Sequence, residues 1–383
     1  MSFGEVGVVA LAIYLLGLVA VAEVARRARK DNTPADHFLA GRGLGAFVLF
    51  LTLYATAYSG NSLLGYPGEA YRRGFSWIMA TGFMMSIIVV FHALVPKLRP
   101  LAVRHGFVTP GDWIRHRFGS EPDGGRLRAA IALLMAIALA NFLLAQLIAM
   151  GHVAHEVTQG IVPYVAGVLG LATMILVYET LGGMRAVAWT DAVQSVLMGG
   201  GLLARLGWLL NDAGGLAAVS RAIAEVKPEA VTVPEWTEQA NWASTIVLLG
   251  TASVLYPQAI QRVYAAESGA ALRRALSFMT FLPLTTTLVV TLIGLAAIPR
   301  LAGLGTLEAD AVMPRLLGEW AETGTAVIAL AVLVFLGALA AIMSTADSVL
   351  LSLGSVIAVD LMGRDRRDPA TTALAKRAAA ISM

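Results

Sequence analysis

Long apolar stretches dominate the pattern of this chain. Nine stretches contain roughly the 20 mostly apolar residues that a helix needs to cross ~30 Å of hydrocarbon. They lie near 6–25, 44–66, 75–95, 129–151, 161–180, 190–210, 242–261, 277–298 and 325–353. Backbone groups in lipid must form hydrogen bonds within their own segment, so each stretch is predicted to be a helix. The pattern therefore predicts an all-α, polytopic membrane protein.

The composition supports a membrane protein. Hydrophobic residues make up 57% of the 383 residues and charged residues only 14%, with a mean hydropathy of +0.73. A soluble protein would carry about 25% charged residues. The chain has no cysteine, which excludes disulfides and thiolate-ligated metals, and its net charge of +3 gives no support for nucleic-acid binding. The sequence shows no nucleophile–base constellation or phosphate loop, so we expect no enzyme.

The basic residues predict how the chain is oriented. Most of them follow the odd-numbered stretches, for example Arg26 and Arg27 after the first and Arg262, Arg273 and Arg274 after the seventh. The positive-inside rule places these loops in the cytoplasm and the N-terminus outside the cytoplasmic membrane. The first stretch lacks a basic leader and a cleavage site, so we expect it to be retained. A tenth stretch is predicted to start at 378–383, from which we expect the sequence to be truncated.

Polar and helix-breaking residues interrupt two of the stretches. The second contains Ser59, Gly60 and Asn61 at mid-depth, and the seventh contains Ser253, Tyr256, Pro257 and Gln258. Proline removes a backbone donor, so the seventh helix must bend or break. The two interruptions are five stretches apart, as in two inverted repeats, and paired broken helices of this kind indicate a transporter binding site. The alternative is that glycine and proline only allow close helix packing.

Small and hydroxylated residues share one face of the ninth stretch. Ala341, Ser344, Thr345 and Ser348 follow the i, i+3, i+4, i+7 spacing of a helix. Two adjacent hydroxyls could supply oxygen ligands to a hard cation such as sodium, with further ligands from the carbonyls of an unwound helix opposite. The alternative is that these hydroxyls bond to carbonyls of their own helix and link it to its neighbours.

Two acids and two amides also lie in apolar surroundings. Asp347 belongs to the ninth stretch and Asp191 opens the sixth. An acid at membrane depth is expensive and by default indicates a functional site, although Asp191 could instead face cytoplasmic water. Asn141 and Gln146 in the fourth stretch could bind solute or bridge helices.

Four passages resemble the sodium/solute symporter family, which includes carriers of sugars, proline, pantothenate, sialic acid and monocarboxylates. They are FLAGRGLGAFVLFLTLYATAYSGNSLLGYPGEAY (38–71), ETLGGMRAVAWTDAVQSVLM (179–198), QAIQRVYAAESGAALRRAL (258–276) and AAIMSTADSVLLSLGSVIAVDL (340–361). The resemblance implies the inverted-repeat sodium-symporter fold, with five plus five helices and one extra N-terminal helix. The extra helix would be 6–25, the first repeat 44–210 and the incomplete second repeat 242–383 within a single domain, 1–383.

The resemblance also implies site residues. Sodium would be bound by the backbone carbonyls of Ala55, Tyr58 and Ala341 and by the hydroxyls of Ser344 and Thr345. A second cation or a proton would match Asp191, Asp347 and Ser348. Solute contacts are expected from Ser59, Gly60, Asn61, Gln146, Ser253, Tyr256 and Gln258.

Two departures from the family pattern bear on the solute. Ala57 stands where proline carriers have an acid, and Ala252 and Ser253 stand where sugar carriers usually place a large aromatic gate. We therefore expect sodium-coupled import of some other small organic solute, with sodium and the bilayer as partners and no obligate protein partner. The alternative is the transporter-like membrane domain of a bacterial histidine kinase.

Overall fold

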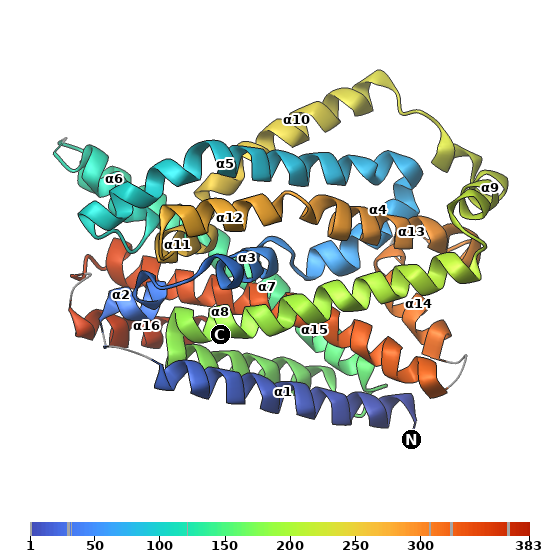
Figure 1. The fold of residues 1–383 in the computed structure, drawn as a ribbon, viewed down its shortest axis with the longest axis horizontal. Helices are drawn as coiled ribbons and strands as arrows, with labels where there is room; N and C mark the ends of the chain where they lie inside the picture. Colours follow the sequence, from blue (N-terminus) through green and yellow to red (C-terminus); the bar gives the residue numbers. More distant parts are fainter. Residues whose placement is uncertain are drawn as a thin grey trace.

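The computed structural model describes residues 2–28, 31, 33–120, 122–305, 308–321, 325–365 and 368–383. The described residues form helices and no strand, apart from a single parallel bridge between Leu44 and Ala266. The α-helices, shown in Figure 1, are α1 Phe3–Arg27, α2 Pro34–Leu39, α3 Ala46–Ala57, α4 Tyr66–Arg73, α5 Met79–His105, α6 Pro110–Phe118, α7 Gly124–Val157, α8 Tyr164–Asp212, α9 Leu216–Val226, α10 Trp236–Ala252, α11 Pro257–Ala265, α12 Gly269–Met279, α13 Leu288–Arg300, α14 Val312–Ala321, α15 Thr325–Ser355 and α16 Pro369–Ser382.

Apolar side chains cover much of the outside of this bundle. Leu16 on α1 is 70% exposed, Val89 on α5 65% and Leu134 on α7 68%. Exposing such a surface to water would cost much free energy. Lipid tails are as apolar as the side chains themselves, so contact with them carries no such cost. Six helical stretches of the described chain are long and apolar enough to cross a membrane, and the bent pair α10–α11 makes a seventh.

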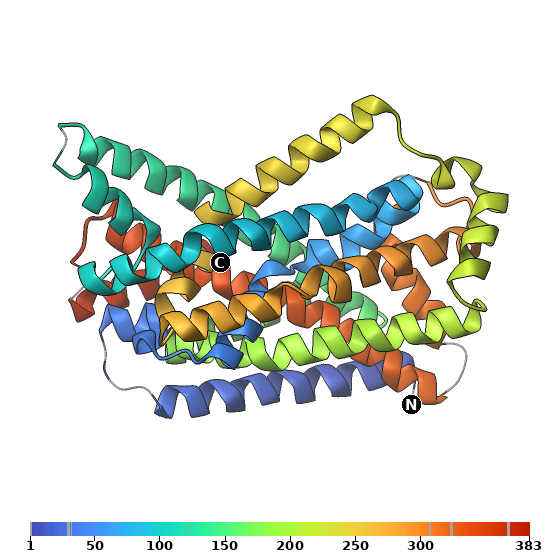
Figure 2. The same ribbon diagram turned by 45° about the horizontal axis from the view of Figure 1, so that its top comes forward.

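Seven crossings by length correspond to nine predicted stretches for two reasons. One is that the second stretch (44–66) is divided between α3, which is too short to count by length, and the start of the helical run 61–105, in which a 3₁₀ turn joins α4 to α5. The other is α8, whose 49 residues would measure about 74 Å if straight, far longer than the bilayer is thick. At Gly183 the backbone leaves the helical region (φ 56°, ψ −149°), and α8 turns back there. Its second limb runs alongside α1 (Figure 2), where Gln194 donates to the Tyr14 hydroxyl.

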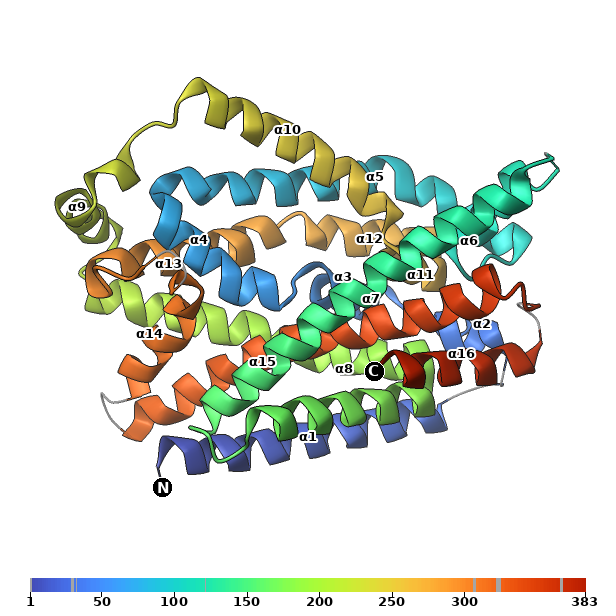
Figure 3. The same cartoon turned by 180° about the vertical axis from the view of Figure 1, so that it is seen from behind.

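α15 lies at the centre of the bundle. Every residue from Val334 to Val356 is buried, and a helix that is apolar and buried on all sides belongs in the interior. It packs against α1, α3, α7 and α8; Figure 3 shows it crossing behind α7. The polar face of α15 is therefore aimed at other helices rather than at lipid.

Both interrupted stretches are broken helices. α3 ends at Ala57, Tyr58 is extended (φ −116°, ψ 107°), and a π-helical turn at Asn61–Gly65 leads into α4. α10 ends at Ala252, Tyr256 is extended, and α11 starts at Pro257 with a bend of 56° between the two halves. The breaks predicted from glycine, proline and polar residues are thus confirmed.

Candidate functional site

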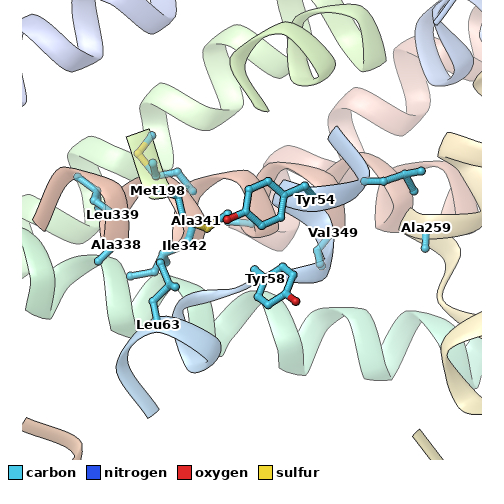
Figure 4. Close-up of a cluster of buried hydrophobic side chains, with 14 of the residues drawn as sticks. Tyr54, Tyr58, Leu63, Met198, Ala259, Ala338, Leu339, Ala341, Ile342 and Val349 are labelled. Carbon is cyan, nitrogen blue, oxygen red and sulfur yellow. The ribbon is translucent and has the colours of Figure 1, made fainter. Parts of the chain in front are cut away.

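The first break frees backbone carbonyls beside α15. A helix that ends leaves its last carbonyls without partners in the helix, and α3 ends in the middle of the bundle. The carbonyl of Ala55 receives a hydrogen bond from the hydroxyl of Ser344 at 3.2 Å. Gly60 allows this close approach, because a Cβ there would lie 2.5 Å from Cγ1 of Ile342 on α15. Figure 4 shows Tyr58 at the end of α3 and Leu63 beside Ile342.

Four of the five residues expected around sodium meet at this point. The Ser344 hydroxyl lies 3.2 Å from the Ala55 carbonyl and 3.0 Å from the Ala341 carbonyl, and the Thr345 hydroxyl lies 3.0 Å from that same Ala341 oxygen. Two carbonyl and two hydroxyl oxygens therefore converge in a buried place, which is a suitable donor set for a hard cation.

The fifth expected residue, Tyr58, was expected to contribute its backbone carbonyl, and among the described residues this carbonyl accepts no hydrogen bond from Ser344 or Thr345. Its phenol points to Thr287, with 3.1 Å between the two hydroxyl oxygens. Its backbone is extended and lies three residues beyond Ala55, at the position where α3 unwinds. The hydroxyls of α15 also bond within their own helix, as the packing alternative requires, but the contact from Ser344 to Ala55 crosses to the broken helix.

A buried arginine occupies the second expected site. The Arg262 guanidinium donates from Nη2 to Asp191 Oδ2 at 2.9 Å and from Nε to the Thr52 hydroxyl at 2.7 Å, and it also contacts the Ser348 hydroxyl. The interpretation of Arg262 as a cytoplasmic loop residue is therefore wrong, because it lies within α11 and is fully buried. Asp191 is fully buried as well, so it does not face cytoplasmic water.

Asp347 joins the same network through two hydroxyl groups. The Tyr178 hydroxyl donates to its Oδ2 at 2.7 Å and the Ser348 hydroxyl to its Oδ1 at 3.2 Å. Ser348 also donates to the Ser344 carbonyl at 2.6 Å, which connects this network to the hydroxyl face. The two carboxylates and the one guanidinium form a buried cluster whose formal charges sum to −1.

The expected solute residues fall into two neighbouring cavities. Ser59, Ser253, Tyr256 and Gln258 line a central cavity of about 110 Å³ between the two breaks. Gly60, Asn61 and Gln146 line a wider cavity of about 550 Å³ that continues along α4 to Glu69, Arg72, Arg73 and Trp77. Gln146 and Gln258 each keep a buried Oε1 with no partner among the described residues.

The apolar walls of the central cavity were not predicted. They include Met84, Ile88 and Phe91 on α5, Phe142 on α7 and Met279 on α12. Such residues occur throughout membrane helices, so nothing in their sequence pattern distinguishes a wall of the cavity from a lipid-facing side. Arg262 was missed for a related reason, since basic residues near the end of a stretch normally mark the cytoplasmic loop.

The sequence is similar to those of known sodium symporters. The sequence model of the sodium:solute symporter family matches residues 37–383. The sodium/pantothenate symporter of Escherichia coli is 31% identical over 58% of this chain and 45% of its own length. The sodium/proline symporter of Escherichia coli is 28% identical over 92% of this chain and 70% of its own. The chain thus spans about half the length of the first of these relatives.

The architecture also matches solved transporters. A sodium-coupled sialic acid symporter in a substrate-bound, outward-open state superimposes with a TM-score of 0.79 and 19% identity, over 98% of this chain and 78% of the other. The described fold is therefore the inverted-repeat sodium-symporter fold that the sequence predicted. Taken with the match across residues 37–383, this means that the chain belongs to the sodium:solute symporter family.

Proposed function

We propose that this protein imports a small organic solute together with sodium by alternating access. The observation that carries the proposal is the contact of the Ser344 hydroxyl with both the Ala55 and the Ala341 carbonyl, at 3.2 and 3.0 Å. A sodium ion among these oxygens would hold broken α3 against α15. That contact shapes the central cavity next to it, so bound sodium would organise the solute site.

The membrane orientation follows from the basic residues. Arg26 and Arg27 end α1, and α2, α6 and α16 lie at that same end of the bundle (Figure 1). By the positive-inside rule this end faces the cytoplasm and the N-terminus faces outside. The 550 Å³ cavity, which runs along α4 to Arg72 and Arg73, then opens to the outside.

Polar contacts close the cytoplasmic end. The Arg42 guanidinium donates to the carbonyls of Tyr264, Ala102 and Phe107 at 2.9, 3.2 and 2.8 Å. The Gln261 side chain accepts from Ser352 at 2.7 Å and donates to Ser355 at 2.6 Å. These contacts fix α11 to α5 and α15, and they would have to separate for solute to leave to the cytoplasm.

The cluster of Asp191, Asp347 and Arg262 is a candidate binding site for a second cation or a proton. Asp191, Asp347 and Arg262 together carry a formal charge of −1 in a fully buried place, and a buried charge is costly unless it is compensated. Asp347→Asn removes this charge without changing the side-chain shape. We expect the number of charges moved per solute, measured as current against solute uptake, to fall in the variant if a second cation binds; an unchanged ratio would restrict coupling to the site at Ser344.

The relatives reported above are transporters, which favours import over the sensor alternative. Moving one sodium charge across ~100 mV releases ~2.3 kcal/mol, before any concentration gradient is added. That is enough for roughly fiftyfold accumulation of a neutral solute, since each 1.4 kcal/mol corresponds to a factor of ten.

The test removes one hydroxyl from the sodium site. In Thr345→Ala, the sodium concentration that half-maximally stabilises the protein against heat should rise by at least tenfold, because an oxygen ligand is lost. Thr291→Ala is the matched control, since Thr291 is also buried and also bonds to the carbonyl four residues earlier, at 2.8 Å. The control should bind sodium as the native chain does. An unchanged sodium affinity in Thr345→Ala would remove this site from the proposal.

A further inference from the structure

Two buried tyrosines of the broken helix α3 reach the same turn of a neighbouring helix. The rings of Tyr54 and Tyr58 meet edge to face, with 5.3 Å between their centroids (Figure 4). The Tyr54 hydroxyl lies 2.8 Å from the Thr286 hydroxyl, and the Tyr58 hydroxyl lies 3.1 Å from the Thr287 hydroxyl. A phenol that is buried without a hydrogen bond is costly, so both bonds stabilise this packing. They connect α3 to the segment between α12 and α13.

The two threonines lie on a π-helical turn. This turn, Pro283–Thr287, follows α12 and leads into α13. A π-helical turn accommodates an extra residue in a helix, and such turns often occur at functional sites. Thr286 and Thr287 are its last two residues, and both are buried. The turn therefore presents two neighbouring hydroxyls to α3, one for each tyrosine.

The backbones of the two tyrosines are held in different ways. Tyr54 lies within α3, and its carbonyl accepts a hydrogen bond from the amide of Tyr58 at 3.2 Å. Tyr58 is the first residue after α3, and its backbone is extended. Helical hydrogen bonds therefore set the direction of the Tyr54 carbonyl but not that of the Tyr58 carbonyl. The orientation of Tyr58 depends instead on its side chain, whose far end is bonded to Thr287.

The segment that contains this turn contacts the broken helix on both sides of its break. Before the break, the two threonine hydroxyls bond to tyrosines of α3. After the break, α4 packs so closely on α13 that a Cβ at Gly294 would lie 2.8 Å from Cβ of Ala70. The Tyr71 hydroxyl of α4 also donates to the Leu301 carbonyl, at 2.6 Å. The residues from Pro283 to Leu301 thus form a support along which the unwound part of the chain is held.

Resting on the proposed function, we infer that Thr287 is a positioning residue for the sodium site and acts through Tyr58. The carbonyl of Tyr58 is an expected sodium ligand, and the bond between the two hydroxyls fixes the residue that carries this carbonyl. Groups that orient the ligands of a metal ion affect its affinity without touching the ion. The bond between Tyr54 and Thr286 has no such effect, because the Tyr54 carbonyl is already bonded within α3.

Two matched hydroxyl deletions test this inference. Thr287→Val and Thr286→Val each replace a buried hydroxyl by a methyl group and leave one tyrosine without its partner. Sodium affinity is measured as the sodium concentration that half-maximally stabilises the purified protein against heat, with potassium chloride keeping the ionic strength constant. We expect Thr287→Val to weaken sodium binding about tenfold, as the loss of a group that orients a ligand does, and Thr286→Val to leave it unchanged. Equal sodium affinities in the two variants would overturn the inference.

The tyrosine partners provide the same comparison from the other side of the bonds. Tyr58→Phe is expected to weaken sodium binding as Thr287→Val does, whereas Tyr54→Phe is expected to bind sodium as the native chain does. The double variant Tyr58→Phe, Thr287→Val should bind sodium no more weakly than either single variant, because the same bond is lost only once. Losses that add up in the double variant would show that the two side chains act separately and would contradict the inference.

Two further results separate this inference from the proposed function. Thr287→Ser keeps the hydroxyl and should restore native sodium affinity; a tenfold loss in this variant would mean that the hydrogen bond is not what matters. If sodium does not stabilise the native chain more than potassium does, the proposed function fails and the inference fails with it. If Thr345→Ala weakens sodium binding while Thr287→Val and Tyr58→Phe do not, the sodium site stands and only the role of Thr287 is rejected.

Discussion

The two helix breaks of this protein differ in what surrounds them. The break after α3 has no proline and is packed against α15, where Tyr58 is 1% exposed and Gly60 leaves no space for a side chain. The break after α10 has a proline and a 56° bend, and Tyr256 there is 45% exposed. Both breaks line the central cavity, but only the first is packed closely against a central helix of the bundle.

This difference assigns different tasks to the two breaks. Carbonyls freed in a packed place keep a fixed geometry, which a cation needs for tight coordination. A break beside open space can adapt to a solute of variable shape. Arg262 joins the two, since it belongs to α11 and donates to Thr52 of α3 and to Asp191 of α8. Each of the following predictions alters one side of this comparison or the link between them.

The largest effect on stability is expected at Arg262, which joins the two breaks. Arg262→Met should destabilise the protein by about 3–5 kcal/mol, because it leaves Asp191 buried without its cation. Thermal unfolding in detergent measures this loss. The double variant Asp191→Asn, Arg262→Met should recover part of it, since residue 191 then no longer carries a buried charge that has lost its partner. Arg273→Met, at an exposed position of α12, is the control and should change the stability by less than about 0.5 kcal/mol.

A smaller effect is expected at the packed break. In Gly60→Ala, the new Cβ would approach Ile342 to 2.5 Å, so the break has to move away from α15. We expect a loss of about 1–3 kcal/mol in stability and a weaker affinity for sodium. Gly17→Ala on α1 meets no atom within 4 Å and should be neutral or slightly stabilising. A Gly60→Ala protein with native sodium affinity would show that this break does not shape the cation site.

The smallest effect on stability is expected at the open break. Pro257 is the first residue of α11, where proline loses no helical hydrogen bond and its fixed φ suits the helix. Pro257→Ala should therefore change the unfolding free energy by at most about 1 kcal/mol. Sodium affinity should remain native while solute affinity changes, and the two are measured separately by thermal shift. A large loss of sodium affinity would mean that the two breaks do not act separately.

Much of the fold could be predicted because the bilayer restricts what a chain can form. Stretches of about 20 apolar residues must be helices, and Pro257 together with Ser59–Asn61 located both breaks. The two limbs of α8 were predicted as separate helices, but the reversal at Gly183 was not located. Its φ is 56°, and an added Cβ would lie 2.4 Å from the carbonyl oxygen of His37, so the need for glycine there depends partly on a residue far away in the sequence.

The residues of the candidate sites could be predicted only where neighbouring positions on one helix supply the ligand atoms. The helical spacing of Ser344 and Thr345 marks a hydroxyl face, and the structure brings that face to the Ala55 carbonyl. The same kind of reasoning failed for Arg262, since its partner Asp191 is 71 residues away and an isolated arginine after an apolar stretch normally lies in a loop.

The sequence by itself determined that this chain enters a membrane as helices, where two of those helices break, and which face of 325–353 carries hydroxyls. Those properties depend on short-range backbone chemistry and on the cost of polar groups in lipid. Only the tertiary structure decided that an arginine neutralises Asp191 and that the central cavity has uncharged, mainly apolar walls. In an apolar helix every face has a similar composition, so the neighbours of a side chain, rather than its type, determine whether it contacts lipid, another helix or a solute.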